Sequence, residues 1–174
     1  MLLLTCATPG CDRGPRLPNE LTFEGSRLEK ATAWSTGEIS GVVFVPPGEK
    51  LETASLQVGI LVSQEHASGV ELHKWVMEQY RKSPTAQWYE SSNSEEACKV
   101  GLGQGPPRPF VALHVCRSAS GVSACAEADE RLGDDVVGRC LNRGGDCWDE
   151  LCTQMWASRR AALEAEVYGV LGSR

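Results

Sequence analysis

The sequence has little positive charge and no long apolar run. It carries 17 Lys and Arg against 23 Asp and Glu, which gives a net charge of −6. Because nucleic acids and anionic lipid surfaces are bound by a basic face, this balance argues against both kinds of partner. Apolar runs such as residues 1–4 are far shorter than the about 20 residues that a membrane-spanning helix needs. The 174 residues, of which 41% are hydrophobic, instead fit one globular domain with a core.

The cysteines lack the spacings that mark metal and redox sites. The chain contains no C-x-x-C pair, which zinc ribbons, thioredoxin-like motifs and c-type haem attachment sites require. Frequent cysteine without such a spacing favours disulfides, and disulfides favour an exported protein. The alternative is a cytosolic protein whose reduced thiols are mostly buried. The cysteines are Cys6, Cys11, Cys98, Cys116, Cys125, Cys140, Cys147 and Cys152.

The N-terminal residues suggest an export signal. Residues 1–10 are uncharged, and the small residue Gly10 directly precedes Cys11. This junction resembles that of bacterial lipoproteins, in which the cysteine becomes the acylated N-terminus of the mature chain. The resemblance covers residues 1–11 alone and implies a signal segment there, lipidation at Cys11, and a periplasmic or outer-membrane location. Removal of Cys6 with the signal would leave an even number of cysteines after Cys11, which can pair completely.

Residues 12–20 contain prolines and a glycine and no periodic apolar residue, so we expect a tether there. Short segments rich in β-branched and aromatic residues follow, separated by turn signals, and they predict strands. An amphipathic helix over 69–82 interrupts them. It is predicted by a capping box of Ser68 and Glu71, and by Leu72 and Trp75 on one face. The predicted strands are 21–24, 28–36, 40–45, 55–63, 87–91, 97–102 and 110–116.

The last third of the chain changes to a helical pattern. Ala128, Leu132, Val136 and Cys140 recur at i, i+4 spacing, and residues 142–145 form a turn before the possible N-cap Asp146. This pattern predicts a helical hairpin over 124–171 after a sheet part over 21–117. The expected fold is a single α+β domain over 21–174. It has a mostly antiparallel sheet, one inserted amphipathic helix and the C-terminal helical hairpin, and it is stapled by disulfides.

The predicted strands and helices suggest disulfide partners. Folding 97–102 back on 110–116 brings Cys98 nearly opposite Cys116, so we predict a Cys98–Cys116 bond. Cys140 and Cys147 bracket the turn of the hairpin, which makes Cys147 or Cys152 the partner of Cys140. Cys147 and Cys152 point about 140° apart on one helix and should not pair with each other. Cys125 would take the remaining helical cysteine.

Few residues suggest catalysis or metal binding. His66 and His73 lie near the start of one predicted helix and could meet around a metal, but no H-E-x-x-H spacing accompanies them. His114 alternates with apolar neighbours, so we expect a half-exposed strand residue. A thiolate metal site of the late cysteines would need Cys125 beside Cys140, Cys147 and Cys152, whose spacing is irregular. We therefore assign no catalytic, metal-binding or cofactor-binding residue.

The expected function is that of a non-enzymatic cell-envelope lipoprotein. It would be held by the lipid on Cys11 and would act as a binding or assembly subunit in a complex with other envelope proteins, with no nucleic acid and no cofactor. One alternative is an envelope inhibitor or immunity protein. Another is a hydrolase whose site is assembled only in three dimensions, from His66, His73 or His114 with a carboxylate or serine. The third is a cytosolic protein that binds a metal through reduced cysteines.

Overall fold

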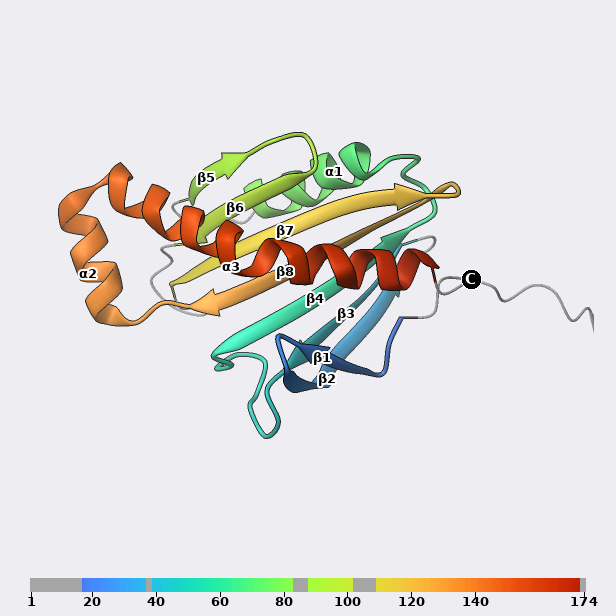
Figure 1. Ribbon diagram of the computed structural model, residues 1–174, viewed down its shortest axis with the longest axis horizontal. Coiled ribbons are helices and arrows are strands. Elements are labelled where there is room, and N and C mark those ends of the chain that lie inside the picture. Colours follow the sequence, from blue (N-terminus) through green and yellow to red (C-terminus); the bar gives the residue numbers. More distant parts are fainter. Residues whose placement is uncertain (1–16, 37–38, 83–87, 102–108, 173–174) are drawn as a thin grey trace, which may run out of the picture.

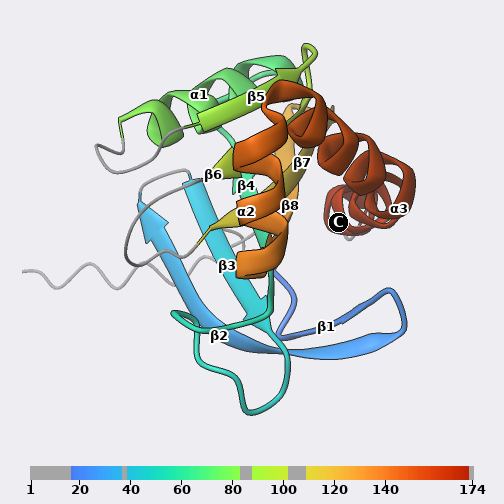
Figure 2. The same cartoon turned by 90° about the vertical axis from the view of Figure 1, so that its left-hand side faces the viewer.

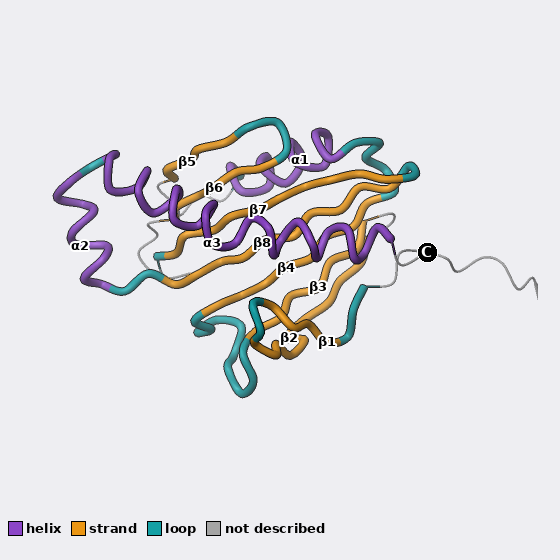
Figure 3. Tube along the Cα trace, viewed as in Figure 1, coloured by secondary structure: helices purple, strands orange, loops and turns teal. Residues whose placement is uncertain are grey.

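The computed structural model describes residues 17–36, 39–82, 88–101 and 109–172. Its strands form an eight-stranded sheet in the order β1-β2-β3-β4-β8-β7-β6-β5, in which every neighbouring pair is antiparallel (Figure 1). One helix follows β4 and two helices follow β8, as Figure 3 shows along the chain. The α+β class is thereby confirmed. The elements are β1 Glu20–Phe23, β2 Ser26–Thr36, β3 Ile39–Val45, β4 Leu56–Ser63, α1 Gly69–Arg81, β5 Trp88–Ser92, β6 Glu96–Gly101, β7 Phe110–Ala119, β8 Val122–Arg131, α2 Asp134–Arg143 and α3 Gly145–Gly172.

The sheet is curled and carries helices on opposite faces (Figure 2). Side chains alternate between the two faces along each strand. His114 of β7 therefore bonds to α1, whereas Arg117 on the same strand bonds to α3. The main hydrophobic core lies between the sheet and α3. Its fully buried side chains include Phe23, Leu28, Phe44, Val58, Ile60, Leu113 and Leu163.

Helix α1 begins where the capping box predicts. The Ser68 hydroxyl accepts a hydrogen bond from the backbone N–H of Glu71, and the Glu71 carboxylate accepts one from the backbone N–H of Ala67. Leu72 and Met77 are buried against the sheet, as the helical spacing of apolar residues requires. The predicted strands before and after this helix are also present, with ends that differ by a few residues.

The prediction of a helix from residue 124 is wrong, because residues 122–131 form strand β8. Two residues with positive φ, Ser120 (51°) and Gly121 (77°), make a two-residue turn that folds β8 directly onto β7. Ala124, Ala126 and Ala128 then alternate with polar residues, a period of two that the i, i+4 interpretation overlooked. The sheet therefore extends to Arg131, and the C-terminal helices begin at Asp134.

The six cysteines from Cys98 onward form three disulfides, Cys98–Cys152, Cys116–Cys125 and Cys140–Cys147. The predicted Cys98–Cys116 bond is wrong. Cys98 pairs in register with Leu113, so Cys98 faces α3 while Cys116 faces α1 across the sheet. The prediction that Cys125 joins a helical cysteine is wrong as well, because Cys125 lies on β8 directly opposite Cys116. Cys140–Cys147 is one of the two predicted alternatives, and Cys147 and Cys152 do not pair.

Residues 1–16 lie outside the described residues, and with them the predicted signal segment, Cys6, Cys11 and most of the predicted tether. The last residue of that tether, Glu20, begins β1. Helix α3 is 28 residues long, but none of the described helices is both long and apolar enough to cross a membrane.

Candidate functional site

A pocket of about 290 Å³ opens on the α1 side of the sheet. Two glycines, Gly41 of β3 and Gly59 of β4, leave room on the sheet, and Trp75 and Tyr80 of α1 form the opposite wall. Trp34 of β2 borders the pocket and remains 41% exposed. Its indole packs over Gly41 so closely that a Cβ at that position would lie 2.6 Å from the ring. The lining is mostly apolar, which suits an apolar group of a ligand or partner.

Buried polar side chains close one end of this pocket. Glu127 of β8 accepts hydrogen bonds from Tyr80 and from Lys99, whose Nζ lies 2.5 Å from Glu127 Oε2. The Lys99 ammonium also stands 3.2 Å above the centre of the Tyr80 ring. Since Lys99 is 1% exposed, its charge is compensated inside the protein rather than by water.

The ionisation of this cluster is set by burial and by the Lys99–Glu127 ion pair. Burial opposes the ionisation of Glu127, but Lys99 and His114 together hold its pKa well below the ordinary value. Burial and the Glu127 carboxylate raise the pKa of both Tyr80 and Asp129, and the Tyr80 hydroxyl donates to Glu127. A carboxylate held in this way is a weak base near neutral pH, which disfavours general base catalysis by Glu127.

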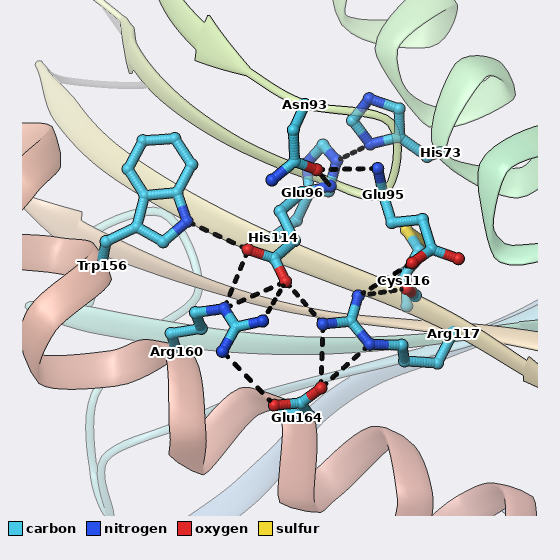
Figure 4. Close-up of polar contacts among 11 residues, drawn as sticks. His73, Asn93, Glu95, Glu96, His114, Cys116, Arg117, Trp156, Arg160 and Glu164 are labelled. Carbon is cyan, nitrogen blue, oxygen red and sulfur yellow. Dashed lines mark hydrogen bonds and ion pairs between the residues drawn. A yellow bond between two sulfur atoms is a disulfide. The ribbon is translucent and has the colours of Figure 1, made fainter.

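Two histidines contact each other beside the Glu127 carboxylate. His114 Nδ1 lies 3.5 Å from Glu127 Oε2, and His114 Nε2 lies 2.7 Å from Nδ1 of His73 on α1. The Glu127 carboxylate can only accept, so it favours the His114 tautomer with its proton on Nδ1, and in that tautomer His73 donates to His114 Nε2. The Cys116–Cys125 disulfide lies beside this pair. Figure 4 shows His73 and His114 pointing toward each other, with Cys116 nearby.

The third histidine takes no part in this arrangement. His66 Nδ1 lies 2.8 Å from the hydroxyl oxygen of Ser63, and the His66 ring contacts Trp75. Ser63 is fully buried, and its hydroxyl also accepts hydrogen bonds from the backbone N–H groups of Glu65 and His66. This contact stabilises the turn before α1. Neither Ser63 nor His66 lines the pocket, so this contact does not present to it the activated serine that a serine hydrolase would require.

A second polar cluster lies on the α3 side of the sheet. Glu96 of β6 accepts hydrogen bonds from Arg117 of β7 and from Arg160 and Trp156 of α3 (Figure 4). Burial opposes the ionisation of Glu96, but these donors lower its pKa to about 2. Arg117 and Arg160 also pair with Glu164 of α3. Because its charges are matched within the cluster, we assign it the structural role of holding α3 on the sheet.

His114 is fully buried, whereas the alternation along its strand had predicted a half-exposed residue. His73 bonds to His114 and His66 bonds to Ser63, so the site of His66 with His73 that we considered from the sequence and did not assign is not formed. The alternative thiolate site is not formed, since Cys125 is bonded to Cys116, Cys152 to Cys98, and Cys140 to Cys147. Sequence reasoning missed Lys99 and Glu127. The one available signal was a lysine between Cys98 and Val100 in an apolar strand.

Comparison with known proteins adds no function to this geometry. No protein-family model matches the chain, and neither a curated protein nor a solved structure matches it.

Proposed function

We propose that the chain is a non-enzymatic cell-envelope lipoprotein that binds an envelope protein partner through the α1 side of its sheet. The observation that carries the proposal is the apolar pocket beside the exposed Trp34. Large aromatic side chains next to a pocket are typical of the residues that dominate protein interfaces. The three disulfides support an oxidising location.

The edge of β2 supports an extended segment of a protein as the occupant. Strand β1 pairs only with residues 26–29 of β2, and among the described residues no strand pairs with the same edge of residues 30–36. Such an edge offers backbone N–H and C=O groups to an added strand. Trp34 lies on this stretch and borders the pocket. The partner we propose therefore supplies an extended segment with a large apolar side chain, and the net charge of −6 favours a basic one.

Filling the pocket should abolish binding without unfolding the protein. A Cβ at Gly59 would meet only the Val42 carbonyl oxygen, at 4.0 Å, so Gly59→Leu places its side chain in the pocket. We expect Gly59→Leu to lower affinity by at least about tenfold, as loss of a central interface contact does. The measurements are quantitative capture of the partner from detergent-solubilised envelopes, and titration with the apolar dye 1-anilinonaphthalene-8-sulfonate.

Tyr168→Ala is the matched control for this experiment. Tyr168 is 52% exposed on α3, across the sheet from the pocket, so its loss should leave capture and dye binding unchanged. Equal capture by the Gly59→Leu variant and the wild type would remove the pocket from the proposal. Unchanged dye affinity in that variant would mean that the dye binds elsewhere and that the pocket is not the apolar site.

The lipid anchor is tested separately, at a residue outside the described part of the chain. Cys11→Ser should move most of the protein from the membrane to the soluble fraction, because each buried CH₂ of an acyl chain contributes about 0.8 kcal/mol to membrane binding. Cys6→Ser is the control, since Cys6 would leave with the signal. Cell fractionation and the mass of the mature N-terminus provide the readouts. A Cys11→Ser protein that stays with the membrane would refute lipidation at this residue.

A further inference from the structure

The clustered histidines and the cross-strand disulfide contain four potential ligands for one metal ion. His73, His114 and Cys116 each present one ligand atom, and these atoms lie within 4.8 Å of one another. All three residues are buried. The sulfur of Cys125 is bonded to that of Cys116, which makes it the fourth potential ligand. Two sulfurs and two imidazole nitrogens form one of the ligand sets of tetrahedral Zn²⁺ sites.

The surroundings of His114 match those of a metal ligand. A ligating histidine usually donates its other ring N–H to a carboxylate, which fixes the ring and directs the free nitrogen at the metal. His114 Nδ1 already faces Glu127, and its Nε2 faces His73. Glu127 is itself held by Lys99 and Tyr80. The ring of His114 is therefore oriented before any ion arrives.

We propose that opening the Cys116–Cys125 disulfide converts this cluster into a buried Zn²⁺ site formed by His73, His114, Cys116 and Cys125. The reductant is a dithiol. Its two electrons and two protons break the Cys116–Cys125 S–S bond and leave two thiols, while the dithiol itself closes to a disulfide. When Zn²⁺ binds, both thiols release their protons to water, and the proton between His73 Nδ1 and His114 Nε2 moves to His73 Nε2, so that both facing nitrogens carry a lone pair. Two thiolates and Zn²⁺ sum to zero charge, as the disulfide does, so no net charge is added to the interior.

The pocket provides a route for both the reductant and the ion. Cys125 and His114 both line it, so two of the four residues of the cluster border a cavity that opens to the surface. The oxidised protein keeps a disulfide at this position, and the reduced protein would keep a metal there. The strands β7 and β8 would remain cross-linked in either state. This inference stands independently of the proposed partner.

The test uses the full chain, reduced with a phosphine and freed of metal, then titrated with Co²⁺ and Zn²⁺. We expect the reduced chain to give the absorption of tetrahedral Co²⁺ with a sulfur-to-cobalt charge-transfer band, and Zn²⁺ to displace the Co²⁺. The oxidised chain should give neither signal. His73→Gln and His114→Gln should each weaken Zn²⁺ binding by about 10- to 100-fold or more, since even outer-shell partners of a metal have effects of that size.

Matched cysteine variants separate this site from unspecific binding by thiols. Replacing Cys116 and Cys125 with serine should remove the charge-transfer band, whereas replacing Cys140 and Cys147, the disulfide between α2 and α3, should retain it. Identical Co²⁺ spectra in the histidine variants would overturn the proposal. If the reduced chain loses its fold, Zn²⁺ should restore the native circular dichroism, and a chain that stays unfolded with Zn²⁺ would overturn it too.

Discussion

Lys99→Met is expected to destabilise the folded protein by about 3–5 kcal/mol at neutral pH, because it leaves the buried carboxylate of Glu127 without its cation. The loss should shrink as the pH falls. In the wild type the low pKa of Glu127 contributes stability that is present above its ordinary pKa and lost on acidification. Without Lys99, only the His114 contact and the Tyr80 hydrogen bond still oppose the effect of burial, so the pKa of Glu127 rises and its protonation on acidification relieves the variant. Urea unfolding at several pH values measures the difference.

Two further variants decide whether the ion pair is responsible. The double variant Lys99→Met/Glu127→Gln removes both charges, so it should be more stable than Lys99→Met alone. Lys30→Met removes an exposed lysine of β2 that bonds to Asn19, and it should change stability by less than about 0.5 kcal/mol. A loss in Lys99→Met that is independent of pH and remains in the double variant would point to lost packing rather than to an unpaired charge.

The helix and the strands before residue 118 were predictable because each is specified by residues within its own segment. The capping box of Ser68 and Glu71 fixes the start of α1 through contacts within one helical turn. Strand β8 was not predictable from the same kind of evidence. Alanine has little preference for strands, and residues 122–131 are held as a strand by β4 on one side and β7 on the other. That pairing begins at the turn of Ser120 and Gly121, whose local signal was weaker than the apparent helical spacing.

The candidate site was harder to predict because its residues meet only through strand register. Lys99 on β6, His114 on β7 and Glu127 on β8 lie on three adjacent strands, and each is unremarkable in its own segment. A shift by one residue in either pairing would turn one of these side chains to the α3 face. The same alternation of side chains between the two faces of the sheet explains which cysteines pair. A simple hairpin of β6 and β7 would place Cys98 near Cys116, but their side chains lie on opposite faces of the sheet.

The two faces of the sheet have different roles. On the α3 side, apolar packing, the Glu96 cluster and the Cys98–Cys152 disulfide attach the long helix. On the α1 side, the shorter helix covers β7 and β8 but leaves the pocket over β3 and β4 open. Apart from the Lys99–Glu127 pair, stability should therefore depend mainly on contacts of the α3 side, whereas a side chain that fills the pocket should alter binding. Removal of the Cys98–Cys152 disulfide gives the clearest measure of how much the α3-side contacts contribute to stability.

Replacing both Cys98 and Cys152 with alanine should cost more stability than removing either of the other two disulfides in the described part of the chain. This bond joins residues 54 positions apart, whereas the other two join residues 9 and 7 positions apart. The chain-entropy relation assigns about 4 kcal/mol to the long connection and a little over 2 kcal/mol to the shortest. For a domain of this size, 4 kcal/mol corresponds to a fall in melting temperature of roughly 10 °C. Calorimetry and urea unfolding measure both values.

The Cys140→Ala/Cys147→Ala variant is the matched control, because it also removes one disulfide and two buried sulfurs. Its smaller loss should be confined to α2 and the start of α3, while Leu163 and Val167 keep the rest of α3 on the sheet. Non-reducing peptide mapping of the wild type should first find Cys98 linked to Cys152. If the two double variants lose equal stability, loop closure does not determine the contribution of these bonds, and the long helix is held mainly by its apolar face and its arginine–glutamate contacts.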